Sequence, residues 1–198
     1  PVLLPLSHAG EGATHSRWIV DMKLALLGDG ESPHLLEWAR ALAVHGDVEL
    51  HAASTRRFLP GFDEVIPASR RLALDTHPRH RGGNVDVLTT LPRLSRWLRA
   101  VDPDWIHAHY LTSHGTLAWL AQHIGAVGVR ARLAASAWGS DVLVTPERSV
   151  IARMLLRRVL AASAVTTSDS QHMAQRMRHF GARDVMVFPS GLRELPPA

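Results

Sequence analysis

Short, continuously apolar runs alternate with amphipathic stretches along the chain, and this alternation constrains the fold more than any other feature. The run from Leu24 to Leu27 is typical of a strand buried on both faces, and residues 35–43 then repeat apolar side chains at helical spacing. Strands that alternate with helices favour parallel pairing. We therefore predict an α/β fold with an open, doubly wound, mostly parallel sheet of about six or seven strands. The predicted strands are 22–28, 48–53, 64–67, 105–110, 132–138, 164–168 and 184–188.

The amphipathic stretches predict five helices. In the helix at 85–101, Pro92 either kinks the helix or marks its true start. The helix at 147–162 is predicted to bury one apolar side, made of Val150, Ile151, Met154, Leu155 and Val159, and to expose its arginines. Apart from the short strand at 64–67, residues 56–83 are predicted to form a basic loop. The predicted helices are 33–46, 85–101, 116–124, 147–162 and 170–180.

Composition limits the class of protein. The 198 residues suffice for one domain with a sizeable core. The formal charge is +4 with scattered arginines, so we expect no nucleic-acid partner. The absence of cysteine excludes thiolate metal sites, and no apolar run reaches the about 18–20 residues of a membrane span. Residues 1–21 lack periodicity and are predicted to be an extension, either disordered or not native.

A glycine turn, Gly28-Asp29-Gly30, follows the first strand and precedes a helix, whose cap is Asp29 or Ser32. Backbone N–H groups at such a helix start suit a phosphate, although a plain strand–helix turn explains the glycines equally well. The third glycine of a dinucleotide fingerprint is absent, and no acid follows the second strand to bind a ribose. Arg56 suits a 2′-phosphate, so NADP binding stays open as an alternative.

Three histidines lie in residues 105–115, WIHAHYLTSHG. Strand alternation places His107 and His109 on the same face. A catalytic zinc needs three protein ligands, and no acid-rich cluster joins His114 or Asp141 to this pair, so we predict no metal site. His107 is interpreted as a packing residue, and His109, near the carboxyl end of its strand, as a functional one. His114 is given no role.

Two further turns follow predicted strands at the edge where parallel sheets bind ligands. In residues 138–141, Gly139 permits close backbone approach, and Asp141 is either a carboxylate at that edge or a helix cap. In residues 168–170 either serine can cap the next helix. The arginines of 147–162 suit anionic lipid headgroups, with a solvated helix face as the alternative.

Taken in order, several of these pieces resemble the N-terminal half of retaining GT-B glycosyltransferases of family 4. The resemblance covers residues 22–192 and implies a Rossmann-like domain that forms one half of a GT-B fold. Its motifs are the glycine turn, Ser32-Pro33-His34, residues 105–109 (WIHAH), 138–143 (WGSDVL), 165–168 (VTTS) and 187–191 (VFPSG).

The resemblance implies transfer of a sugar from a nucleotide-sugar donor to a glycan, lipid or small-molecule acceptor. His109 would be the catalytic residue, in contact with the sugar or the leaving group. The residues near the donor phosphates would be Gly28, Asp29, Gly30 and Ser168. The residues on the acceptor side would be Ser32, His34, Gly139, Ser140 and Asp141.

The resemblance also implies that most of the donor site is missing, because the family's second domain holds the nucleotide. Residues 193–198 correspond to the start of a truncated interdomain linker. We expect the chain to be inactive alone, to need a donor-binding domain or subunit, and to bind no cofactor or metal by itself. We expect it in the cytoplasm, with weak peripheral contact at the inner face of the membrane. The alternatives are an NADP-dependent oxidoreductase and a non-enzymatic binding domain.

Overall fold

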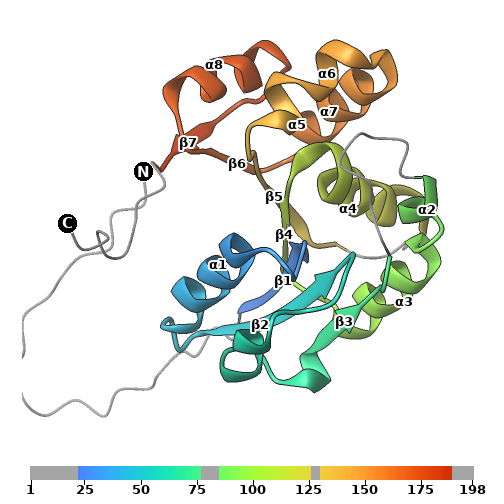
Figure 1. Cartoon of the computed structure of the whole chain (residues 1–198), viewed down its shortest axis with the longest axis vertical. Coiled ribbons are helices and arrows are strands. Elements are labelled where there is room, and N and C mark those ends of the chain that lie inside the picture. Colours follow the sequence, from blue (N-terminus) through green and yellow to red (C-terminus); the bar gives the residue numbers. More distant parts are fainter. Residues whose placement is uncertain (1–21, 77–84, 126–129, 189–198) are drawn as a thin grey trace, which may run out of the picture.

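All seven strands lie in one sheet, and every neighbouring pair runs parallel (Figure 1). The computed structural model describes residues 22–76, 85–125 and 130–188. The strand order is β3-β2-β1-β4-β5-β6-β7, so the chain starts in the middle, builds one edge and returns to build the other. This topology confirms the predicted α/β class and the doubly wound sheet. The strands are β1 (Met22–Gly28), β2 (Val48–Ser54), β3 (Arg71–Ala73), β4 (Trp105–His109), β5 (Arg132–Ser136), β6 (Val165–Ser168) and β7 (Val185–Val187).

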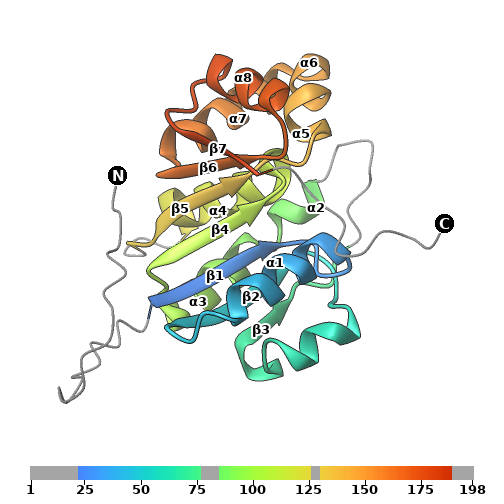
Figure 2. The same cartoon turned by 90° about the vertical axis from the view of Figure 1, so that its left-hand side faces the viewer.

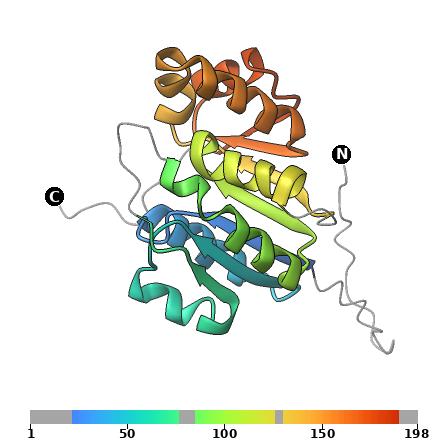
Figure 3. The same ribbon diagram turned by 90° about the vertical axis from the view of Figure 1, so that its right-hand side faces the viewer.

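Helices cover both faces of the sheet. Helix α1 (Pro33–Ala43) lies over β1 and β2 on one face, and the longer green-to-orange helices lie on the other (Figures 2 and 3). Right-handed crossovers produce this arrangement. The sheet grows in one direction from β1 to β3 and in the opposite direction from β4 to β7, so the connections of the two halves lie on opposite faces. The other helical segments are α2 (Val85–Leu88), α3 (Leu91–Val101), α4 (Thr116–Leu120), α5 (Ser140–Leu143), α6 (Thr145–Arg148), α7 (Val150–Ala162), α8 (Gln171–His179), η1 (Pro60–Glu64), η2 (Ala68–Arg70), η3 (Leu111–Gly115) and η4 (Ala121–Gly125).

Strand β1 separates two hydrophobic clusters. Leu24 and Leu26 pack with α1 on one face, whereas Ala25 and Leu27 join the larger cluster on the other. A leucine as fully buried as Leu26 contributes about 1.5–3 kcal/mol to stability. Both faces of β1 are covered, and this explains why its residues are apolar without alternation.

The predicted strand at 64–67 is wrong. Residues 60–64 form η1, and the edge strand is β3, which pairs with β2 from Arg71 to Ala73. Phe62 and Ile66 are fully buried against the α1 side, so this part of the predicted basic loop packs into the core. Phe62 and Ile66 lie between Pro60 and Pro67, and apolar residues in so short a segment do not distinguish a strand from a turn.

Pro92 stands in the first turn of α3, so it marks a helix start, as one of the two predicted alternatives requires. A separate short helix, α2, precedes it. The predicted helix at 116–124 begins earlier, because the chain is already helical from Leu111 in the wide turn η3. Helix α1, which follows the glycine turn, begins at Pro33 as expected. Ser32 occupies its N-cap position, but the Ser32 side chain accepts no hydrogen bond from the helix backbone.

The predicted buried side of α7 is wrong in its main members. Val150, Ile151 and Met154 face solvent, whereas Leu156, Val159 and Leu160 face the sheet. Aliphatic residues occur on both sides of this helix, so the spacing alone does not determine which side is buried.

None of the helices in the described part of the chain has the length and the apolarity needed to cross a bilayer. The predicted extension at 1–21 and the predicted linker at 193–198 lie outside the described residues.

Candidate functional site

His107 and His109 lie on the same face of β4, as strand alternation predicts. Their ring centroids are 4.2 Å apart, and the indole of Trp38 from α1 stands edge-on to both, at 4.9 and 5.4 Å. The two imidazoles therefore lie between the sheet and α1, at the carboxyl end of a central strand. This edge is where open parallel sheets bind their ligands.

His107 has a hydrogen-bond partner within the sheet. Its Nε2 is 2.7 Å from Ser136 Oγ on β5, and that hydroxyl in turn lies 2.6 Å from Thr167 Oγ1 on β6. Burial lowers the pKa of His107 to about 4, so its ring is neutral near pH 7. Its surroundings are those of a packing histidine, as the sequence suggests.

His109 differs from His107 because neither ring nitrogen has a hydrogen-bond partner among the described residues. Its side chain is only 3% exposed. Burial, together with the neighbouring His107 and His114, holds the pKa of His109 well below its ordinary value, so the ring is neutral. A neutral imidazole offers one N–H donor and one acceptor. A buried polar group without partners is uncommon and calls for an explanation such as a ligand.

The turn after β4 has an unusual backbone. Tyr110, directly after His109, has φ +71°, a conformation that a non-glycine residue rarely adopts. Leu111–Gly115 then follow as a π-helical turn, a feature frequent at functional sites. Strained backbone of this kind persists only where surrounding contacts fix it.

Asp141 provides some of the contacts that hold the turn after β4 in this conformation. Its carboxylate is fully buried and accepts the backbone N–H of Leu111 at 2.7 Å and that of Trp138 at 3.0 Å. Burial raises the pKa of Asp141 to about 6, against the lowering effect of these N–H groups. Asp141 therefore ties the turn after β4 to the turn after β5. Its predicted place in an acceptor pocket stays a prediction.

Trp138 connects the buried histidine to the surface. Its indole lies 5.7 Å from the His109 ring and 4.7 Å from the ring of His34, which is exposed at the start of α1. Gly139 follows with φ +111°, which favours glycine, and Ser140 Oγ lies 2.9 Å from the hydroxyl of Tyr110. The structure thus brings together the predicted residues His34, His109, Gly139 and Ser140.

The glycine turn is closely packed against the segment that follows β2. Gly30 N–H donates to Ser54 Oγ at 2.8 Å, and a Cβ at Gly30 would stand 2.4 Å from the carbonyl oxygen of Arg57. Asp29 accepts the N–H of Glu31 through its side chain and that of Ser32 through its carbonyl. Close backbone approach therefore accounts for Gly30. Phosphate binding by Gly28, Asp29 and Gly30 stays a prediction.

Ser168 ends β6 and is bonded locally, donating to the carbonyl oxygen of Ser170 at 2.9 Å. Ser170 is the cap of α8, since its hydroxyl accepts the N–H of Met173. Of the two serines that the sequence offers as caps, Ser170 takes that place. The predicted donor contact of Ser168 stays a prediction.

His114 makes a structural contact that the sequence did not predict. It is buried, and its Nε2 lies 2.9 Å from Thr55 Oγ1, which joins the turn after β4 to the turn after β2. The two residues are 59 positions apart, so only the strand order brings them together. Trp38 was missed for the same reason, although a large aromatic residue on the helix after β1 was an available signal.

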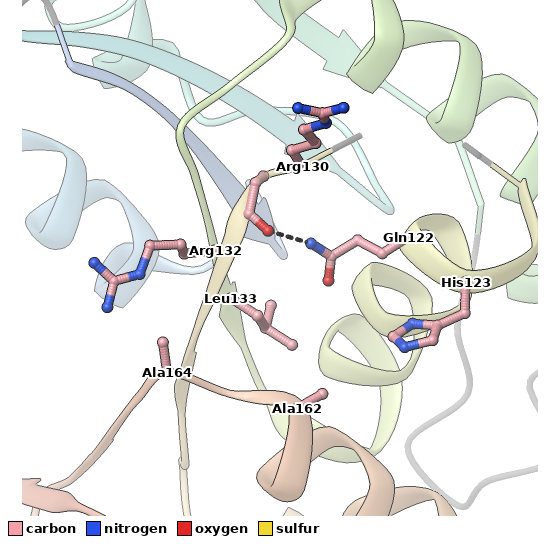
Figure 4. A pocket seen from close by; sticks show the side chains of 8 residues that line it. Gln122, His123, Arg130, Arg132, Leu133, Ala162 and Ala164 are labelled. Atoms are coloured by element: carbon pink, nitrogen blue, oxygen red, sulfur yellow. Dashed lines mark hydrogen bonds between the residues drawn. The ribbon is translucent and has the colours of Figure 1, made fainter. Parts of the chain in front are cut away.

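No three histidine, aspartate or glutamate side chains gather as metal ligands within the described ranges. A hollow of about 490 Å³ lies at the opposite edge of the sheet, where Gln122 Nε2 donates to the carbonyl oxygen of Ala131 near the start of β5 (Figure 4). Because parallel sheets bind ligands at the carboxyl ends of their strands, we place the candidate site at His109 and not at this hollow.

Comparison with known proteins gives one family and a set of similar folds. Residues 23–170 match the family described as glycosyl transferase 4-like. No curated protein matches the sequence. A sucrose-phosphate synthase structure from Thermosynechococcus elongatus is similar at TM-score 0.60 and 17% identity, over 87% of this chain and 91% of that chain.

Two other similar structures are longer than this chain. The MnaA–UDP co-structure from S. aureus matches at TM-score 0.56 and 16% identity, over 84% of this chain and 44% of that chain. A UDP-N-acetylglucosamine 2-epimerase from Rickettsia bellii matches at TM-score 0.56 and 11% identity, over 82% of this chain and 42% of that chain. The present chain therefore spans less than half of either, and these identities support the fold alone.

Proposed function

The chain belongs to the glycosyl transferase 4-like family, and from that premise we propose that it is the acceptor-side domain of an enzyme that transfers a sugar from a nucleotide-sugar donor. The observation that carries this proposal is the environment of the His109 side chain. This side chain is a buried, neutral imidazole at the carboxyl edge of the sheet, and neither of its nitrogens has a partner among the described residues. A ligand hydroxyl or phosphate oxygen would satisfy it.

His109 would act in this reaction as a hydrogen-bonding group. Its lowered pKa keeps the ring uncharged near pH 7, so one nitrogen donates and the other accepts. A donor placed close to the anomeric centre stabilises charge that develops on the sugar or the leaving group. The indoles of Trp38 and Trp138 hold the ring in one orientation and exclude water from it.

The acceptor would approach on the side of Trp138. His34 and Ser32 stand at the start of α1, and Gly139 and Ser140 stand at the start of α5. Asp141 would shape this side through the backbone groups of Leu111 and Trp138 that it holds. The acceptor would be a glycan, a lipid or a small molecule.

The donor phosphates would lie near Gly28, Asp29, Gly30 and Ser168, and most other donor contacts would come from a second domain or subunit. This chain would therefore transfer no sugar alone and would hold no cofactor or metal by itself. The proposal includes a cytoplasmic location with peripheral membrane contact.

Reconstitution with a donor-binding half tests the proposal. The chain is mixed with, or fused to, the donor-binding domain of a family member, and release of the nucleotide is measured. His109→Ala should lower turnover by about 10²–10³-fold, the effect of losing one oriented hydrogen-bond donor. His114→Ala is the matched control, because His114 bonds only within the protein in the described structure.

Equal losses in the two variants, once both are shown to be folded, would contradict the assignment of His109. Recovery of transfer on mixing would exclude a purely non-enzymatic binding domain. Quenching of NADPH fluorescence by the chain alone would instead favour the oxidoreductase alternative.

A further inference from the structure

Large apolar side chains are exposed where α5, α6 and α7 follow one another. The exposed fractions of Val150, Ile151 and Met154 are 78%, 67% and 53%. Leu143 and Val144, at the end of α5, are exposed at 36% and 39%. We call these five residues the apolar face of α5–α7.

The core does not account for this surface. Helix α7 packs on the sheet through Leu156, Val159 and Leu160, which are fully buried. Polar residues at 150, 151 and 154 would therefore leave the packing of the helix unchanged. Apolar residues gathered on a surface in this way mark a place of interaction.

Arginines surround the apolar face. Arg148 precedes α7, and Arg157 and Arg158 follow Met154 by about one turn; all three are exposed. No described carboxylate forms an ion pair with them. Between residues 143 and 162 the only acid is Glu147, and it is already paired with Arg153 and Arg176. The segment thus combines an apolar centre with a positive margin.

We propose that the apolar face of α5–α7 docks on an anionic lipid bilayer. Helices that lie in a membrane interface insert an apolar side while flanking arginines bind lipid phosphates. The sign of the charge indicates the occupant. Arg148, Arg157 and Arg158 have no ion-pair partner among the described residues, and the one nearby acid, Glu147, is already paired, so this surface is complementary to anionic lipid headgroups.

Docking would also set the distance between the bilayer and the candidate site. Helix α5 begins at Ser140, directly after the turn that holds Trp138 against His109. A bilayer bound at Leu143 and Val144 would therefore lie within a few residues of that turn. The docking proposal does not rest on sugar transfer, because it is tested without donor or acceptor.

Co-sedimentation with vesicles tests the proposal. The full chain is mixed with vesicles of phosphatidylcholine alone or with about one third phosphatidylglycerol. We expect binding to the anionic vesicles that weakens with added salt, and little binding to the neutral ones. The triple variant Val150→Ser, Ile151→Ser, Met154→Ser and the double variant Arg157→Gln, Arg158→Gln should each lower the partition coefficient at least about tenfold.

Matched controls use exposed residues elsewhere. Val44→Ser removes an apolar side chain that is 79% exposed, and Arg93→Gln, Arg96→Gln removes two exposed arginines of α3. Both should bind as the unaltered chain does, and all variants should keep its circular dichroism. Absence of binding to anionic vesicles at low salt would overturn the proposal. So would a triple variant that binds vesicles normally but loses self-association or its complex with a donor-binding half.

Discussion

Two buried polar side chains at the carboxyl edge of the sheet, Asp141 in α5 and His109 at the end of β4, differ in their hydrogen bonding. Asp141 is fully buried, and its two oxygens accept backbone N–H groups from the turns after β4 and β5. His109 is 3% exposed, and its two nitrogens have no partner among the described residues.

This difference separates a group that is hydrogen-bonded within the domain from one that would be hydrogen-bonded to a ligand under the proposed function. A buried polar group costs free energy unless it is hydrogen-bonded. Asp141 meets that requirement inside the protein and holds the strained turn at Tyr110 and Leu111 in place. His109 has no hydrogen-bond partner among the described residues, and under the proposed function a bound ligand would supply one.

Removal of Asp141 should give the largest loss of stability. Asp141→Ala leaves the N–H groups of Leu111 and Trp138 buried without an acceptor, so we expect a loss of about 3 kcal/mol in the free energy of unfolding. Urea denaturation followed by circular dichroism measures it. Asp169→Ala, at an exposed position, is the control and should change stability by less than about 0.5 kcal/mol. A similar small change for Asp141→Ala would remove the contrast with His109.

The pH dependence of stability should differ in sign between the two residues. The folded-state pKa of Asp141 is raised from 3.8 to about 6, so the native state binds the extra proton and stability from this group falls as pH rises through that window. The folded-state pKa of His109 is lowered from 6.5, so the unfolded chain binds the extra proton and stability from this group falls as pH drops below 6.5.

The effect of Asp141 should amount to about 2 kcal/mol between pH 4 and 6. Compared with the unaltered chain, Asp141→Asn should make stability rise more steeply with pH, and His109→Leu should make it rise less steeply. Urea titrations at four pH values measure the slopes. Shifts in the same direction would show that one of the two protonation states is misassigned.

Among the variants of the candidate site, His109→Leu should change stability least at pH 7. It removes no hydrogen bond to a described residue, so the free energy of unfolding should fall by no more than about 1 kcal/mol and could increase. His107→Leu is the matched comparison and should cost more, because it removes the contact with Ser136 Oγ. If His109→Leu cost more than His107→Leu, the absence of partners at His109 would be in doubt.

The sequence predicted much of the frame. Apolar runs identified β1, β2, β4, β5 and β6, and the strand–helix alternation predicted the parallel sheet. The predictions from the sequence were wrong for the strand at 64–67 and for the buried side of α7. In both places apolar residues indicated burial or amphipathicity without specifying direction, since either side of α7 carries enough aliphatic residues to pack on the sheet.

The candidate site was predicted in part. Strand alternation correctly put His107 and His109 on one face. The turns after β1, β4 and β5 placed the candidate residues at the carboxyl ends of the strands, and their functional role stays a prediction. Their contacts were not predictable. His114 reaches Thr55 across 59 positions, and Asp141 reaches Leu111 across 30.

By itself the sequence determined the local periodicities, the glycine turns and the strand ends at which the candidate side chains lie, because these depend on residues close together in the chain. The tertiary structure alone decided which polar groups are hydrogen-bonded, which side of α7 meets water, and that His109 has no partner among the described residues. Those outcomes depend on strand order, which brings distant segments into contact, and no local pattern encodes the identity of a neighbour from another strand.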